Sequence, residues 1–231
     1  DKAFADDHAV VAGIGTIGTH RAVIIGQQKG RNTKENLFRN FGMMKPEGYR
    51  KALRVMKIAE KFHLPIVTLV DTPGADPGIA AEERGQGFAI ANNLMEMASI
   101  DTPILTIVIG EGASGGALGI GLCDKMLMLQ NTWFSVISPE GCASILWKDS
   151  SKAPEAAEAL KLTPKDLMEH DICNMIIHEP VGGAHRHFDE TILIVKKALI
   201  EQIDSFKKDT SISYLDSRVA RYDKLGSFRE F

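Results

Sequence analysis

The chain has 231 residues, 44% of them hydrophobic and 25% charged, and its formal net charge is −3 at pH 7. A chain of this length and composition can bury a core without help from disulfides or metals. The slightly negative charge gives no electrostatic reason to expect nucleic acid or an anionic membrane as the main partner.

The first predicted element is a β-hairpin with strands over residues 9–14 and 22–26, and with Gly18 and Thr19 in its turn. Its segment GIGTIG (13–18) matches the GxGxxG fingerprint of dinucleotide-binding folds. That fingerprint requires a helix after the last glycine, whereas the following residues read as a strand. The hairpin interpretation is therefore preferred over nucleotide binding.

A helix is predicted over residues 46–62, with Pro46 in its first turn. Four basic residues lie along one face of this helix: Arg50, Arg54, Lys57 and Lys61. Such a stripe beside a ligand loop could hold phosphates or an acidic partner, so Arg54 and Lys57 are candidate substrate-binding residues. A solvated helix face is the more common explanation of this pattern.

Strands and helices alternate along the rest of the chain. Strands are predicted over 65–70, 103–109, 125–129, 134–137 and 172–177, and helices over 82–98, 117–122 and 189–207, with a short helix that begins at Thr163-Pro164. Continuously apolar strands are typical of a sheet that is buried on both faces. The sequence therefore predicts an α/β fold with a mostly parallel sheet, in one domain over residues 1–231.

Two loops follow two successive predicted strands. DTPGADPG (71–78) comes after the strand 65–70, and GEGASGG (110–116) comes after the strand 103–109. Ligands bind outside the carboxyl ends of strands in open α/β sheets, so we expect the loops to be neighbours at a ligand site. Two ordinary strand-to-helix turns are the alternative. The candidate substrate-binding residues in these loops are Gly74, Ala75, Gly112 and Ala113.

The segment GASGG (112–116) also matches the GxSxG nucleophile elbow of hydrolases, and its strand–turn–helix context agrees. In that interpretation Ser114 is the nucleophile and His185 lies downstream, although triad partners meet only in space. Alternatively, small residues let backbone N–H groups at a helix N-terminus reach a developing oxyanion. We prefer this second interpretation, in which Gly115 and Gly116 act through their backbone.

Metal-binding patterns are weak in this sequence. His185 and His187 could ligate a metal, but two ligands without a third are poor evidence. Cys123, Cys142 and Cys173 are far apart and form no CxxC motif. We therefore expect no metal in this chain, no disulfide framework and a reducing compartment.

A more specific signal comes from six segments in a fixed order. They are QQKGRNTKENLFRNFGM (27–43), PEGYRKALR (46–54), VDTPGADPGIAAEERGQ (70–86), IGEGASGGALGIG (109–121), SVISPEGCASILWK (135–148) and EPVGGAHR (179–186). Over nearly its whole length the chain closely resembles the alpha subunits of bacterial and plastid acetyl-CoA carboxylase carboxyltransferase. The resemblance implies a crotonase-like fold, in which ββα units wind into a spiral core.

The resemblance implies a reaction as well. A carboxyl group moves from carboxybiotin, attached to a separate carrier protein, to acetyl-CoA and gives malonyl-CoA for fatty acid synthesis. In such enzymes the alpha chain stabilises the ureido oxygen of biotin, and the beta chain stabilises the thioester oxygen. Backbone donors suit this task because they need no reorganisation when charge develops. By resemblance, the donors here are Gly115, Gly116 and Ala117.

The partners implied by the resemblance are a beta subunit with a zinc ribbon, in an α2β2 heterotetramer, the biotin carboxyl carrier protein and biotin carboxylase. The expected location is the cytoplasm, or the plastid stroma in a plant or an alga. No apolar run reaches the roughly 18 residues of a membrane span, so no membrane partner is expected. From the resemblance, we expect this chain to be without the family's N-terminal helical extension, and Asp76 and Ala113 stand where Tyr and Gly are frequent in that family.

Two other functions stay open on the residues alone. A stand-alone crotonase-type acyl-CoA enzyme would need its own acid–base pair, for which Glu82, Glu83 and Glu111 are candidates. A serine hydrolase would depend on Ser114.

Overall fold

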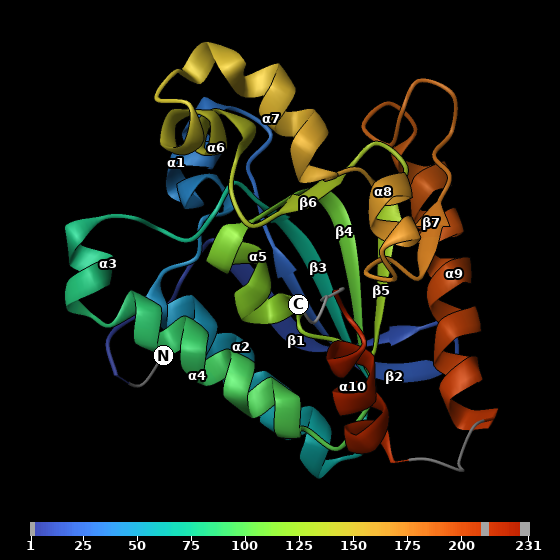
Figure 1. Cartoon of the computed structure of the whole chain (residues 1–231). Coiled ribbons are helices and arrows are strands. Elements are labelled where there is room, and N and C mark those ends of the chain that lie inside the picture. The colour runs from blue at the N-terminus through green and yellow to red at the C-terminus, as the bar shows by residue number, and fades with distance from the viewer. Residues whose placement is uncertain (1–2, 209–212, 227–231) are drawn as a thin grey trace, which may run out of the picture.

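Within residues 3–208 and 213–226, which the computed structural model describes, the chain forms one seven-stranded sheet (Figure 1). The strands are β1 (Val10–Ile17), β2 (His20–Gln27), β3 (Ile66–Thr72), β4 (Ile104–Ala113), β5 (Lys125–Leu129), β6 (Trp133–Ser135) and β7 (Met175–Ile177). Their order is β1-β2-β3-β4-β5-β7, with β6 beside β4. β1 and β2 are antiparallel and the other neighbouring pairs are parallel, so the predicted hairpin and mostly parallel sheet are confirmed.

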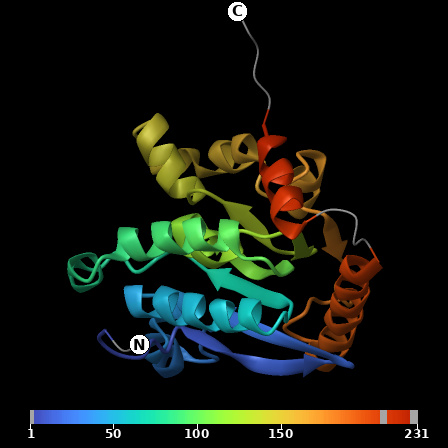
Figure 2. The same ribbon diagram turned by 90° about the horizontal axis from the view of Figure 1, so that it is seen from below.

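Helices connect the strands and cover the sheet. They are α1 (Thr33–Phe38), η1 (Asn40–Gly42), α2 (Pro46–Lys61), α3 (Ile79–Glu83), α4 (Gln86–Ser99), α5 (Ser114–Gly121), α6 (Pro139–Leu146), η2 (Ser150–Lys152), α7 (Ala153–Leu160), α8 (Pro164–Glu169), α9 (Phe188–Lys208) and α10 (Tyr214–Asp223). Figure 2 shows α2, α4 and the α6–α7 pair at successive levels above the β1–β2 hairpin. This succession is what a spiral of strand–helix units produces.

The sheet separates two apolar cores. On one face, Ile104 and Val108 of β4 pack in a cluster with residues of α2, α4 and α5. On the other face, Leu105 and Ile107 of the same strand pack with residues of α9. Successive side chains of a strand point to opposite faces, so one continuously apolar strand serves both cores.

Several predicted boundaries need correction. The helix predicted over 82–98 is two helices, α3 and α4, separated by Gly85, whose φ of +82° interrupts helical geometry. The helix predicted over 117–122 begins at Ser114, because β4 runs directly into α5. The helices α1, α6, α7 and α10 were not predicted from the sequence. The single domain expected over 1–231 includes residues 1–2, 209–212 and 227–231, which lie outside the described residues.

A buried arginine attaches α10 to the rest of the fold. Arg218 is 1% exposed, and its guanidinium lies 2.9 Å from each carboxylate oxygen of Asp124. The same group donates hydrogen bonds to the carbonyl oxygens of Met97, Ile100 and Thr102. These carbonyls lie at the end of α4 and in the segment that leads into β4, so α10 covers this end of the molecule.

Candidate functional site: a cavity between two glycine-rich loops

The two glycine-rich loops meet in a cavity of about 460 Å³. Residues 73–77 and 113–115 line it at the carboxyl ends of β3 and β4, as predicted. Further walls come from the start of α4 and from Ile137 and Ser138, which precede α6. The loops 71–78 and 110–116 are thus confirmed as neighbours.

The N-terminus of α5 faces this cavity. The N-cap residue of α5 is Ala113, and no side chain caps the helix there. The first N–H groups of an α-helix have no acceptor within the helix, which here applies to Ser114, Gly115 and Gly116. Ser114 and Gly115 line the cavity, so this turn can donate hydrogen bonds to a ligand oxygen. In regular helical geometry the Ala117 N–H instead donates to the Ala113 carbonyl.

Two more helices begin at the same cavity. Gln86 and Gly87, the first residues of α4, line it, and so does Ser138, whose hydroxyl caps α6 by accepting from Gly141 N at 3.1 Å. The positive ends of the helix dipoles therefore point towards one space. None of the described residues that line the cavity is a Lys, an Arg or a His, and the ionisable ones are Asp76 and Glu82.

Internal hydrogen bonds fix the shape of the 71–78 loop. Thr72 Oγ1 donates to Gly74 O at 2.6 Å, and the Asp76 carboxylate accepts from Gly78 N at 2.8 Å and from Asn40 Nδ2 at 3.1 Å. Asp76 therefore holds its own loop to the segment around Asn40. Gly74 has a φ of +153°, a conformation that other residues rarely adopt.

Backbone contact between the two loops explains Gly116. A Cβ added to Gly116 would lie 2.2 Å from Gly74 C and 2.5 Å from Ala75 N. The missing side chain therefore allows α5 to pack against the 71–78 loop, and its space is filled by protein. Gly116 is buried and does not line the cavity.

The structure brings together only part of the predicted site. Gly74, Ala75, Ala113 and Gly115 line the cavity. Gly112 packs instead against β6, where a Cβ would lie 2.6 Å from the Phe134 ring.

Arg54 and Lys57 do not line this cavity. Arg54 is exposed on α2, and the Lys57 ammonium lies 2.8 Å from Glu96 and 3.2 Å from Glu60. Lys57 is thus already paired with carboxylates of α2 and α4.

We expect Arg54→Glu to change the Michaelis constants for acyl-CoA and for biotin derivatives less than about twofold, even at low salt, where surface charges act most strongly. Steady-state kinetics at two salt concentrations measures this. A clear rise at low salt only would show that the stripe on α2 contacts a ligand or its carrier.

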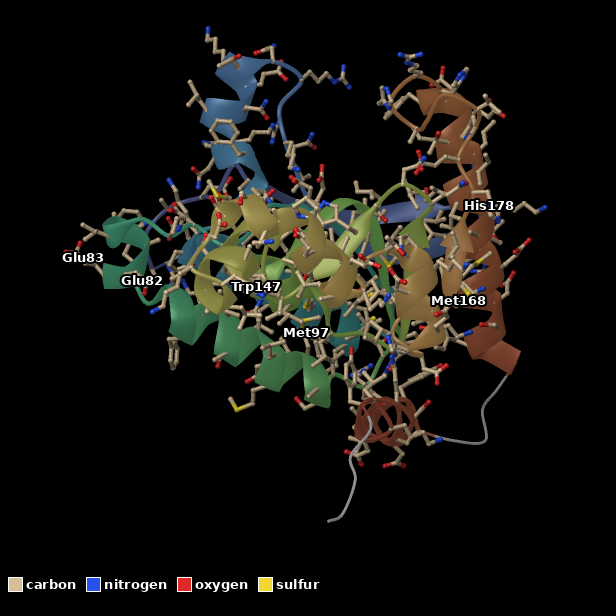
Figure 3. All side chains as sticks on the ribbon, turned by 45° about the horizontal axis from the view of Figure 1, so that its top comes forward. Glu82, Glu83, Met97, Trp147, Met168 and His178 are labelled. Carbon is tan, nitrogen blue, oxygen red and sulfur yellow. The ribbon has the colours of Figure 1, made fainter. Side chains whose placement is uncertain are left out.

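The candidate carboxylates of a stand-alone acyl-CoA enzyme are dispersed. Figure 3 shows Glu82 and Glu83 on α3, at the periphery of the molecule, and of these only Glu82 lines the cavity. Glu111 forms an ion pair with Lys29, which also lies 2.8 Å from Asp71. Burial lowers the pKa of Lys29, but the two carboxylates outweigh it, so the pKa rises overall and Lys29 stays charged.

Ser114 has the backbone of a nucleophile elbow but no histidine beside it in the cavity. Its φ is +56°, between the end of β4 and the start of α5. The lining residues within the described ranges include no His, and His185 is not among them. The geometry therefore offers backbone donors but not a serine–histidine pair.

We expect Ser114→Ala and Ser114→Gly to keep turnover within about threefold of wild type, because both retain the backbone donors. Loss of a triad nucleophile would instead cost a factor of about 10⁴ or more. The assay is the carboxyl transfer that the resemblance implies, measured with the beta subunit that the resemblance leads us to expect as partner. Inactivity of both folded variants would favour the hydrolase interpretation.

Two groups of residues that line the cavity were not among the predicted site residues. Gln86, which is 3% exposed, donates from Nε2 to Met44 O at 2.8 Å and to Asp76 O at 3.0 Å. Ile137 and Ser138 reach the cavity through the fold of the β6–α6 connection. The Ser138-Pro139 pair is a helix-start signal that could have located this wall.

In the part of the chain that the structure describes, no three His, Cys, Asp or Glu side chains gather as a metal ion requires. Cys123, Cys142 and Cys173 are free and buried. None of the helices within 3–208 and 213–226 has the length and apolar character of a membrane span.

Solved structures with a similar fold include a malonate decarboxylase and a transcarboxylase. The chain aligns with a Pseudomonas malonate decarboxylase hetero-tetramer in complex with coenzyme A at a TM-score of 0.73 and 12% identity, over 95% of this chain and 87% of that chain. It aligns with the transcarboxylase 12S at a TM-score of 0.64 and 20% identity, over 74% of this chain and 34% of that chain. The fold is therefore the crotonase-like α/β fold of these proteins.

Sequence comparison gives the family. Residues 1–226 match the family described as "Acetyl co-enzyme A carboxylase carboxyltransferase-like". The chain is 53% identical over 230 residues to the acetyl-coenzyme A carboxylase carboxyl transferase subunit alpha of Flavobacterium psychrophilum, and 50% identical to that of Thermus thermophilus. Each alignment covers 100% of this chain. It covers 73% of the Flavobacterium psychrophilum protein and 74% of the Thermus thermophilus protein. The chain belongs to the acetyl-CoA carboxylase carboxyltransferase alpha-subunit family.

Proposed function

We propose that the chain is the alpha half of a carboxyltransferase that moves a carboxyl group from carboxybiotin, on a carrier protein, to acetyl-CoA. The observation that carries this proposal is the α5 N-terminus, whose first N–H groups have no acceptor within the helix and which lines a cavity in a chain of this family. When carboxybiotin is bound, it supplies the carboxyl group and then a ureido oxygen on which negative charge develops.

The residues of this chain would bind and stabilise that charge. Ser114 and Gly115, in the first turn of α5, line the cavity, and the three helix dipoles would add to the effect of their N–H groups. Such preorganised donors are worth most when they meet charge that appears in the transition state. The described residues that line the cavity include no histidine that could act as a general base. This agrees with a reaction in which the substrate itself accepts the proton.

Exposed apolar side chains around the cavity support the expected beta subunit as a partner. Ile79 and Phe88, on the α3–α4 side, are 79% and 78% exposed. Val136, Ile145 and Leu146, on the α6 side, are 70%, 68% and 67% exposed. Large apolar side chains exposed on both sides of a cavity are typical of a protein interface. A subunit seated here would complete the site, in the proposed α2β2 assembly with the biotin carboxyl carrier protein and biotin carboxylase as further partners.

The experiment that tests this proposal compares the chain alone with the chain plus a zinc-ribbon beta subunit. The readout is malonyl-CoA decarboxylation in the presence of biocytin. We expect little activity from the chain alone and clear activity from the pair, because one oxyanion site leaves the other charge unstabilised. Substantial activity from the chain alone would contradict the shared site. The cytoplasm, or the plastid stroma in a plant or an alga, is the proposed location.

A further inference from the structure

Gln27, the last residue of β2, is a buried residue that contacts both loops of the cavity site, 71–78 and 110–116. It is 5% exposed and does not line the cavity. Its Nε2 donates to Gly116 O at 2.8 Å, and its Oε1 accepts from Asp71 N at 3.1 Å. One partner can only accept and the other can only donate, so the orientation of the amide follows from the backbone.

The two partners of Gln27 belong to the two loops that form the site. Asp71 lies near the end of β3, where the 71–78 loop begins, and Gly116 lies in the first turn of α5. The Gly116 backbone is packed directly against Gly74 and Ala75. One buried amide therefore fixes the ends of β2 and β3 and the start of α5 relative to one another. Tyr49 Oη, 3.5 Å from Gly116 O, gives only a weak second contact.

We propose that Gln27 is a positioning residue for carboxyl transfer, which holds the backbone donors of α5 at the correct distance from the 71–78 loop. This inference rests on the proposed function. A misplacement of about 1 Å by a residue remote from the chemistry can cost about 100-fold in rate. The donors act mainly on charge that develops in the transition state, so loss of Gln27 should lower turnover more than substrate binding.

The chemistry of the amide gives two informative variants. Gln27→Met keeps the approximate volume but removes the hydrogen bonds of the amide with Gly116 and Asp71, and its weaker contact with Met44 Sδ at 3.4 Å. Gln27→Glu keeps an acceptor for Asp71 N, but in its ionised form it has no hydrogen to donate to Gly116 O. A protonated carboxyl group has the donor and acceptor arrangement of the amide, so low pH should restore the contact with Gly116.

The surroundings favour protonation of the carboxyl group in Gln27→Glu. Burial raises the pKa of a carboxyl group, and so do the nearby carboxylates of Asp71 and Glu111. The Lys29 ammonium, which pairs with those two carboxylates, opposes them, and the buried Tyr49 hydroxyl is neutral. The activity of the variant is divided by that of wild type at the same pH, and this ratio corrects for all other titrating groups.

The kinetic test uses each variant in complex with the beta subunit, well below its melting temperature. We expect Gln27→Met to lower kcat about 10- to 100-fold, with Michaelis constants for malonyl-CoA and biocytin within about threefold of wild type. The activity of Gln27→Glu relative to wild type should rise as the pH falls. Gln28→Met is the matched control, because Gln28 is exposed and its side-chain amide donates to Lys29 O, away from Gly116 and Asp71, and it should stay within about twofold of wild type.

Hydrogen exchange gives a readout that does not depend on activity. In the chain alone, the Asp71 amide should exchange at least about tenfold faster in Gln27→Met than in wild type, because its acceptor is gone. It should stay protected in Gln27→Glu, while the helical amides of α5 should exchange faster in both variants. An inactive wild-type complex would refute the proposed function, and the exchange rates would still decide the role of Gln27. More than about half of wild-type turnover with unchanged exchange in Gln27→Met would overturn the positioning role.

Discussion

Gly116→Val is expected to reduce carboxyl transfer at least about 100-fold and to lower the melting temperature of the chain. The Cβ atom would meet the backbone of Gly74 and Ala75 at 2.2 and 2.5 Å, where no side chain can rotate away. The 71–78 loop and α5 must therefore separate. Loss of one oxyanion donor already costs about 10²–10³ in rate, and overpacking costs about 1–3 kcal/mol of stability.

Gly121→Ala is the matched control in the same helix. Gly121 is also buried, but a Cβ there would meet nothing within 4 Å. Alanine should therefore leave turnover unchanged and keep or slightly raise the melting temperature. Turnover of the complex and thermal unfolding of the chain measure both variants. Gly116→Val with more than about a tenth of wild-type turnover would contradict the packing argument.

Arg218→Met is expected to lower the free energy of unfolding by about 3–5 kcal/mol, because it leaves a buried charge uncompensated. The Asp124 side chain is 5% exposed and would lose both contacts with the guanidinium. Turnover at low temperature should change little, since α10 contacts the end of α4 that is opposite to the cavity. Urea unfolding of the chain and kinetics of the complex separate the two effects.

Two further variants test the cause of this loss. Arg54→Met removes an exposed arginine and should stay within about 0.5 kcal/mol of wild type. Asp124→Asn added to Arg218→Met removes the unpaired charge and should recover part of the lost stability. If Arg218→Met unfolds at the same urea concentration as wild type, α10 does not contribute to the folded state as the contacts suggest.

The sequence was most informative where a local pattern determines structure. Continuous apolar runs located β3 and β4, and the glycine and proline residues after them located the two loops. Ligands bind outside the carboxyl ends of strands in open α/β sheets, and this rule predicted that both loops form one site. A glycine can interrupt a helix, but the helical pattern over 82–98 continues across Gly85. The break at this residue, where φ is positive, was therefore not predicted.

Other features depend on contacts between distant parts of the chain. An arginine is usually exposed, so no local pattern indicates that Arg218 is buried against Asp124. Gln27 reads as a polar residue at the end of a strand, and only the fold brings it to Gly116 and Asp71. Gly116 was expected to leave room for a ligand, whereas its space is taken by the neighbouring loop. In each case the partner lies more than 40 residues away along the chain.

The convergence of α4, α5 and α6 on a cavity without basic side chains has a consequence for selectivity. Peptide dipoles do not titrate, so their contribution to the potential in this space does not vary with pH as that of a histidine cluster would. Their influence also fades within about one helical turn. A cluster of lysines attracts polyanions from a distance. These helix ends should instead act on negative charge only where it forms, at the inner surface of the cavity.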